Sequence, residues 1–216
     1  MSNRTLHYLQ LEEQYSAHNY HPLPVVLTRG YRGRLRGPVR VDGARHGAAD
    51  VGDEPLMLSQ SLPVVVSRDR ADGAALAKSL GATVILMDDG FQNPAVAKDA
   101  SLIVIDSVRG VGNARVMPAG PLRAPLAEQI ARTDALVVIG QGHAADGVAA
   151  TGAGQGKPVL RARFKPDETS LAALRGKHVL AFAGIGDPAR FFSTLRDNGI
   201  DVAGTRAFGD HHPLTP

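Results

Sequence analysis

The sequence predicts an α/β fold built on a mostly parallel β-sheet flanked by helices. Short runs rich in β-branched residues alternate with segments of helical spacing, most clearly as a strand at 63–67, a helix at 69–80 and a strand at 82–87. Gly81 ends that helix and leads into the second strand. Two strands joined through a helix run parallel, with a right-handed crossover. This strand–helix–strand unit is the basis of the fold prediction.

The same alternation continues along the rest of the chain. Apolar runs typical of strands occur at 23–28, 102–106, 135–140, 158–164, 178–183 and 200–208, and helical spacing occurs at 126–132, 168–174 and 189–198. Asp187 and Pro188 are suited to the N-cap and the first helical position of the last helix. The small, glycine-rich segment 144–157 predicts a surface loop or linker. We therefore expect an N-terminal arm (1–22), an α/β core (23–143), a linker (144–157) and a second α/β portion (158–216).

The composition is that of a globular protein. The 216 residues are 44% hydrophobic, with no apolar run approaching the ~20 residues of a membrane span. The absence of cysteine excludes disulfides and zinc–thiolate sites and is compatible with a cytosolic setting. Arginine supplies 19 of the 24 basic residues, which suits recognition of phosphate or carboxylate. Because no basic patch is interleaved with aromatic residues, we expect no nucleic-acid partner.

The strongest functional signal lies where the strand at 82–87 ends. Asp88 and Asp89 follow it directly, and Gly90 provides a bend. Ligands of α/β proteins bind outside the carboxyl ends of parallel strands, and carboxylate oxygens are preferred ligands of Mg²⁺. The pattern is that of the Walker B magnesium site in P-loop kinases and nucleotide hydrolases. The alternative is that the two acids only cap a loop.

Two other segments carry candidate residues. Five arginines lie between Arg29 and Arg40, after the strand at 23–28, where they could face phosphate or form a solvated basic loop. Asp53 and Glu54 precede Pro55, and acids there are typical of the first turn of a helix. Helix capping is therefore the simplest interpretation of both acids from the local pattern.

One glycine-rich motif is misleading. The residues from Gly152 to Lys157 approach a Walker A phosphate loop, which requires serine or threonine after the lysine. Pro158 stands at that position, so no hydroxyl is available for magnesium and no helix can begin there. We exclude this segment as a phosphate loop.

Taken in order, the motifs resemble those of the tetraacyldisaccharide 4′-kinase family, the lipid A 4′-kinases of Gram-negative bacteria. The matching stretches are TRGY at 28–31, VGDEP at 51–55, VSRDR at 66–70, DDGFQ at 88–92, PAGPLRAP at 118–125, FAGIG at 182–186, RFF at 190–192 and FGDHH at 208–212. Each stretch is short, and it is their common order and spacing over residues 23–216 that carries the resemblance.

The resemblance implies a P-loop kinase-like α/β domain followed by the start of a smaller second α/β domain. It implies transfer of the γ-phosphate of ATP to the 4′-hydroxyl of the lipid A disaccharide precursor, at the cytoplasmic face of the inner membrane. The expected cofactors are Mg²⁺ and ATP, and the expected partners are the lipid precursor and the membrane surface.

The resemblance also implies roles for individual residues. Asp53 matches the family's catalytic base and His211 matches its histidine partner. Asp88 and Asp89 match the magnesium site. Arg29 and Gln92 lie in motifs near the nucleotide. A carboxylate paired with histidine can accept the proton of an attacking hydroxyl, as phosphoryl transfer requires.

Some features of the family have no counterpart. Its membrane-associated N-terminal helix and its Walker A loop are missing, residues 1–22 lie outside the resemblance, and Asn93 stands where the family usually has histidine. We therefore expect a family member shortened at both ends, with impaired catalysis and uncovered strand edges. The alternative is a non-catalytic remnant that binds acidic lipid or a partner protein through the arginine-rich loop.

Overall fold

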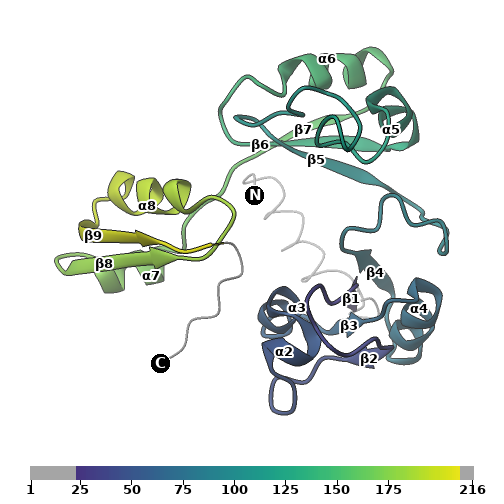
Figure 1. The fold of residues 1–216 in the computed structure, drawn as a ribbon, viewed down its shortest axis with the longest axis horizontal. Helices are drawn as coiled ribbons and strands as arrows, with labels where there is room; N and C mark the ends of the chain where they lie inside the picture. Colours follow the sequence, from purple (N-terminus) through teal and green to yellow (C-terminus); the bar gives the residue numbers. More distant parts are fainter. Residues whose placement is uncertain (1–22, 210–216) are drawn as a thin grey trace, which may run out of the picture. The chain divides into compact units, whose positions relative to one another are not determined.

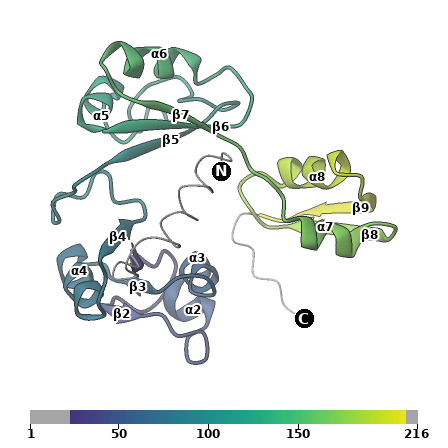
Figure 2. The same cartoon turned by 180° about the vertical axis from the view of Figure 1, so that it is seen from behind.

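The computed structural model describes residues 23–209, and the chain divides into two compact units, residues 1–99 and 100–216. Figure 1 shows the helices and strands, and Figure 2 shows them from behind. No helix within residues 23–209 has the length and apolar character needed to cross a membrane.

The first unit is built on a four-stranded sheet. Its strands are β1 (Pro24–Thr28), β2 (Val39–Arg40), β3 (Val64–Val66) and β4 (Val84–Met87), in the order β2-β3-β1-β4. β1 runs parallel to both β3 and β4, and α4 (Arg70–Ser79) connects those two neighbours. The predicted strand–helix–strand unit is therefore confirmed. The short β2, which pairs antiparallel with β3, was not predicted.

Helices cover both faces of this sheet. Helices α2 (Ala48–Val51) and α3 (Asp53–Leu58) lie on one face, and α4 lies on the other (Figure 1). Alternate residues of β1 serve the two faces, as strand geometry requires. Val26 joins the core with Val51, whereas Leu27 packs toward Ala77 of α4.

The structure corrects one detail of β4. We predicted a buried strand, but Val84 and Leu86 are exposed. The reason is that β4 is an edge strand of the sheet and pairs only with β1. Ile85 and Met87 pack against the α4 side, while the core on the α2–α3 side includes no residue of β4.

The second unit contains a three-stranded parallel sheet. It consists of β5 (Leu102–Asp106), β6 (Ala135–Ile139) and β7 (Val159–Ala162), with α5 (Leu126–Arg132) and α6 (Asp146–Gly154). Ile130 of α5 and Val148 of α6 share one core with Leu136 of β6.

The prediction of a loop or linker at 144–157 was wrong, because this segment forms α6. The small residues that suggested a loop are those that let the helix approach the sheet. Val148, Ala149 and Gly152 are buried, and Gly152 lies against Leu136 so closely that it leaves no space for a Cβ. The other domain boundaries stay predictions.

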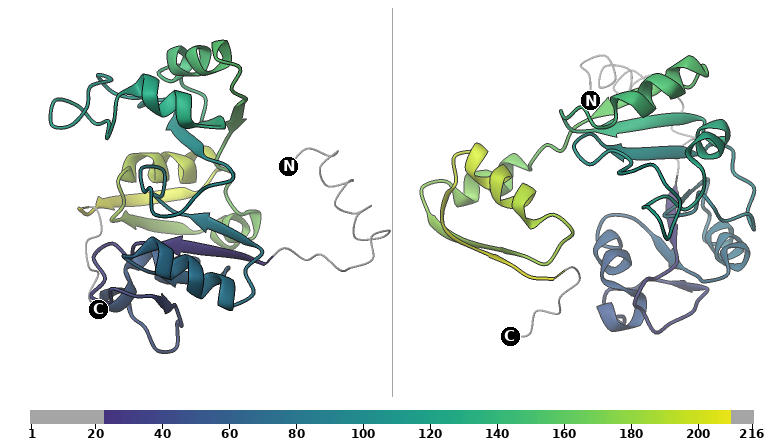
Figure 3. Two further views of the ribbon diagram at one scale, coloured as in Figure 1. Left: turned by 90° about the vertical axis from the view of Figure 1, so that its right-hand side faces the viewer. Right: turned by 45° about the horizontal axis from the view of Figure 1, so that its top comes forward.

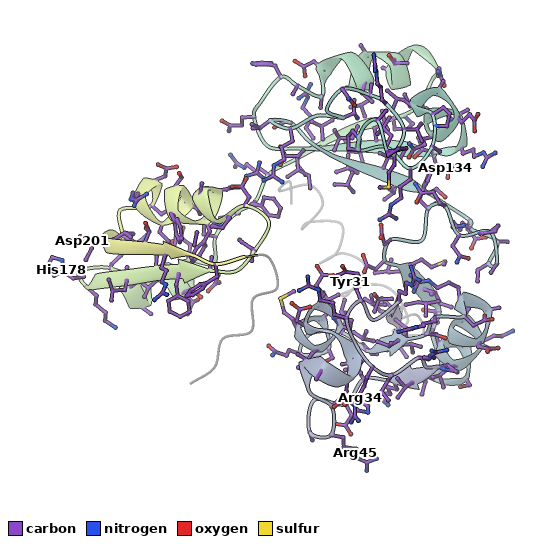
Figure 4. The ribbon with its side chains drawn as sticks, in the orientation of Figure 1. Tyr31, Arg34, Arg45, Asp134, His178 and Asp201 are labelled. Carbon is purple, nitrogen blue, oxygen red and sulfur yellow. The ribbon has the colours of Figure 1, made fainter. Side chains whose placement is uncertain are left out.

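The second unit also contains a two-stranded parallel sheet, formed by β8 (His178–Ala183) and β9 (Asp201–Ala207) with α7 (Glu168–Leu174) and α8 (Pro188–Asp197). Figure 3 shows α8 lying along the two strands. The predicted cap is confirmed, because Asp187 accepts the N–H of Arg190 at 3.1 Å. Figure 4 labels His178 and Asp201 at the first residues of β8 and β9, where Nδ1 and Oδ2 lie 2.7 Å apart.

Candidate functional site

The carboxyl ends of β1, β3 and β4 place three segments at one edge of the first sheet, because the three strands are parallel. The chain continues there into Arg29, Ser67 and Asp88 respectively. Backbone hydrogen bonds extend the pairing past the strand ends. The N–H of Ser67 donates to the carbonyl of Thr28 at 3.0 Å, and that of Asp88 to the carbonyl of Leu27 at 3.0 Å. The edge therefore has a defined geometry up to the first aspartate.

Asp88 and Asp89 present oxygen ligands at this edge. The Thr28 hydroxyl donates to Oδ2 of Asp88 at 3.1 Å, which orients that carboxylate. Asp89 has a φ of 51°, in the left-handed region that residues other than glycine seldom occupy. Both aspartates are exposed. The carboxylates of these two successive aspartates, the first of them bonded to a hydroxyl, are hard-oxygen donors of the kind that Mg²⁺ prefers.

The donor set does not complete a metal site by itself. Within residues 23–209, no group of three or more His, Asp or Glu side chains could hold a metal ion. A magnesium ion at Asp88 and Asp89 would thus take its remaining ligands from water and phosphate oxygens, as magnesium sites that bind nucleotides usually do.

Two arginines add positive charge near the pair of acids. Arg70, the first residue of α4, is 4% exposed, and its Nη2 donates to the main-chain oxygen of Asp88 at 3.1 Å. Burial lowers the pKa of Arg70, the charge of Asp88 opposes that shift, and the charge of Arg29 adds to it. Arg29 itself is exposed just after β1. This edge of the sheet therefore combines two cations with two carboxylates.

Asp53 lies beside the loop that follows β1. The N–H of Arg34 donates to the carbonyl of Ala49 at 3.0 Å, so the loop runs along α2. The loop also passes close to Gly52, where a Cβ would lie 2.6 Å from the main-chain oxygen of Tyr31. Asp53 is the first residue of α3 and is exposed. Its position is compatible both with the capping interpretation and with a role beside the strand ends.

The structure gives less information on the two remaining predicted residues, Gln92 and His211. Gln92 is exposed in the turn that follows Asp89. His211 lies outside the described residues, so its pairing with Asp53 stays a prediction.

The arginine-rich loop is largely solvent-facing, but not all of its charge is available. Arg34 pairs with Asp50, with Nε and Oδ1 2.5 Å apart. The N–H of Gly47 and the side chain of Arg34 lower the pKa of Asp50. Figure 4 labels Tyr31 and Arg34 in this loop, and Arg36 and Arg40 are also exposed.

The glycine-rich motif at 152–157 lies at the wrong end of a helix to be a phosphate loop. Gly152 belongs to α6, and Lys157 follows the end of that helix, whereas a phosphate loop precedes a helix. The Lys157 ammonium donates to the carbonyl of Ala131 at 3.3 Å. The interpretation of this motif as a coincidence is supported.

A charge network in the second unit was missed by sequence reasoning. Oδ1 of Asp106, at the end of β5, accepts the N–H of Val108 at 2.8 Å and that of Arg109 at 3.0 Å, and Oδ2 pairs with Arg190 at 2.5 Å. The Arg109 side chain in turn contacts Asp187 at 3.2 Å. The available signal was an acid at the last position of a predicted strand, Asp106 in the run 102–106.

This network predicts a pH dependence of stability. The N–H of Arg109 is the largest of several contacts that lower the pKa of Asp106 below its usual 3.8. The folded state therefore binds fewer protons than the unfolded state, and the stabilisation is complete above pH ~4 and is lost as the pH falls through the lowered pKa. Asp106→Asn should cost about 1 kcal/mol at pH 7 and remove this part of the dependence. Thermal unfolding of the parent and Asp106→Asn at pH 7 and pH 3 measures both effects, with Asp197→Asn, at an exposed position, as the control. If Asp106→Asn kept the pH dependence of the parent, the prediction would be wrong.

Comparison with known proteins gives a consistent result. A family model described as Tetraacyldisaccharide-1-P 4′-kinase matches residues 4–216, and so begins within the segment 1–22 that we had placed outside the resemblance. Two curated relatives carry the name Tetraacyldisaccharide 4′-kinase. The one from Rhodopseudomonas palustris (strain BisB5) is 70% identical over 192 residues, and that from Bradyrhizobium diazoefficiens is 72% identical over 193 residues.

These alignments cover 89% of the chain but only 57% of either relative. A crystal structure of the apo form of LpxK from Aquifex aeolicus, described as in complex with ATP, is 26% identical with a TM-score of 0.68. That match covers 99% of this chain and 69% of the Aquifex chain. The predicted fold class is thereby confirmed.

Proposed function

The chain belongs to the tetraacyldisaccharide 4′-kinase family, and we propose that it carries the cation site and the catalytic base of an ATP-dependent kinase acting on the 4′-hydroxyl of the lipid A disaccharide precursor. The observation that carries this proposal is the edge formed by β1, β3 and β4, where the Asp88 carboxylate accepts from the Thr28 hydroxyl and Asp89 follows directly. Because the acceptor is a lipid, the site would work at a membrane surface, which the family resemblance implies to be the cytoplasmic face of the inner membrane.

The residues fit the steps of phosphoryl transfer. Asp53, with His211 as the partner that the family resemblance implies, would accept the proton of the 4′-hydroxyl as its oxygen bonds to the γ-phosphorus, while the bond from that phosphorus to the β–γ bridging oxygen breaks and ADP leaves. Asp88 and Asp89 would hold Mg²⁺, which offsets the phosphate charge when bound. Arg29 and Gln92 would contact the phosphates from the adjacent loops.

We expect catalysis by these 216 residues alone to be impaired. The sequence contains no Gly-Lys followed by Ser or Thr, so the backbone cradle and lysine that anchor a triphosphate in P-loop kinases are missing from it. The Asp88–Asp89 site would then supply only part of the nucleotide affinity.

Calorimetric titration of the purified chain with Mg-ATP tests the proposal. We expect saturable binding that Asp89→Ala abolishes, because Asp89 would be one of the two residues that hold the Mg²⁺ accompanying ATP. The matched control is Asp99→Ala, which removes an exposed acid of the same unit and should leave binding unchanged. A folded sample that does not bind, or binding that survives Asp89→Ala, would contradict the proposed site.

The exposed arginines favour one alternative, a non-catalytic surface that binds acidic lipid. Binding to vesicles of anionic lipid should then persist without ATP and Mg²⁺, and should weaken in the triple variant Arg32→Ala, Arg34→Ala, Arg36→Ala. Arg34 should contribute least, because it already pairs with Asp50. Replacement of three exposed arginines elsewhere, Arg132, Arg163 and Arg196, is the control for total charge. Equal binding by both triple variants would exclude this alternative.

A further inference from the structure

Arg70 is the one charged side chain that is buried among the residues the structure describes, with 4% of its surface exposed. Burying an arginine is costly unless its donors are paired, and arginine is almost never buried without a partner. Its Nη1 is buried and has no hydrogen-bond partner within residues 23–209. A group kept at such a cost needs an explanation beyond packing.

The neighbouring residues fix the start of α4, and so the position of Arg70. Asp69 caps the helix by accepting the N–H groups of Ala71 at 2.8 Å and Asp72 at 3.1 Å. The Ser67 hydroxyl donates to the carbonyl of Asp69 at 2.5 Å. Gly73 brings the helix against β1, since a Cβ there would lie 2.5 Å from Cδ1 of Leu27. The guanidinium is thereby directed under the end of β4.

Arg70 provides one of three hydrogen bonds that hold Asp88. Its Nη2 donates to the Asp88 carbonyl at 3.1 Å, the Asp88 N–H donates to Leu27 at 3.0 Å, and the Asp88 carboxylate accepts from Thr28 at 3.1 Å. The carbonyl held by Arg70 belongs to the peptide that leads directly into Asp89. Arg70 therefore fixes the orientation of the Asp88–Asp89 peptide, after which the backbone turns.

That turn is strained. Asp89 has a φ of 51°, and a residue other than glycine keeps such a conformation only where its surroundings enforce it. Without the contact to the carbonyl of Asp88, the peptide would be free to rotate toward a relaxed conformation. The direction of the Asp89 carboxylate would change with it.

We propose that Arg70 is a positioning residue that clamps the Asp88 carbonyl and holds Asp89 in the geometry of a divalent-cation site. The inference rests on the proposed function for the identity of that site. Charge alone does not explain the arrangement. Arg68 lies two residues away in the same turn and is exposed, so a solvated cation was available at far lower cost.

The test is a titration of the full chain with MnCl₂ followed by electron paramagnetic resonance. Arg70→Met should weaken Mn²⁺ binding about ten- to a hundredfold, the range typical of outer residues that orient metal ligands. Arg70→Lys keeps a hydrogen-bond donor but lacks the planar guanidinium, so its affinity for Mn²⁺ should fall less than that of Arg70→Met. Arg68→Met removes the same charge from an exposed position and should leave the affinity unchanged. Asp89→Asn should abolish binding.

Hydrogen exchange of the peptide 86–92, measured on the same samples without metal, tests the clamp separately. Arg70→Met should raise exchange in this peptide more than in β6, because the loss is local. Val65→Ala, which removes core volume from the same sheet, is the control for general destabilisation. If the parent chain bound no Mn²⁺ but the exchange result held, the clamp would stand and the proposed cation site would fall. Unchanged exchange in Arg70→Met and Arg70→Lys, or equal effects from Arg68→Met, would overturn the inference.

Discussion

Gly52→Ala is expected to lower the free energy of unfolding of the first unit by about 3 kcal/mol, and to displace the proposed catalytic base. Gly52 both ends α2 and precedes α3, with a φ of 94° and a ψ of 154°. Essentially only glycine adopts this conformation. An added Cβ would also lie 2.6 Å from the main-chain oxygen of Tyr31, so the loop after β1 would have to move.

The effect should reach function because Asp53 is the next residue. Relief of the overlap moves either the loop that carries Arg29 or the start of α3. Urea unfolding followed by circular dichroism gives the stability. Gly43→Ala is the matched control, because a Cβ at Gly43 meets no atom within 4 Å and its φ is not in the left-handed range. If Gly52→Ala unfolded at the same urea concentration as the parent, the junction between α2 and α3 would not require glycine, contrary to our inference.

The alternation of strands and helices could be predicted because each element contains its own signals. Asp187 with Pro188 marked the start of α8, and Gly81 marked the end of α4, before any tertiary contact was known. The linker predicted at 144–157 was wrong for a physical reason. Glycine and alanine are common both in loops and in helices that pack closely on a sheet, and only the contact of Gly152 with Leu136 distinguishes the two.

The candidate site was predictable to the same extent. Asp88 and Asp89 could be found because acids directly after an apolar run form a local pattern. The role that we propose for Arg70 could not be predicted, since it depends on burial and on a contact with a residue 18 positions away. The position of Asp53 likewise depends on glycine contacts between two loops, which the local pattern interprets only as helix capping.

The second large effect concerns self-association of the second unit. In the β5–β6–β7 sheet, the residues in register with Ile105 face the helices, so the adjacent row formed by Val104, Val137 and Leu160 faces the opposite side. Val104 is 61% exposed and Leu160 is 52% exposed. Parallel sheets are normally covered on both faces. This row therefore offers apolar surface to a second molecule.

The double variant Val104→Lys, Leu160→Lys should weaken self-association more than about tenfold, because covering each apolar side chain is worth about 1.5–3 kcal/mol and 1.4 kcal/mol is a factor of ten. Sedimentation velocity over a concentration series measures this. Val108→Lys is the control, since Val108 is 65% exposed but follows the end of β5. The prediction would be wrong if the parent chain stayed monomeric throughout the series, or if the parent and the double variant associated equally strongly. Either result would show that the exposed row does not mediate self-association. Both lysines point away from the core of Ile130 and Leu136, so the variant should keep its fold and the comparison should report the surface alone.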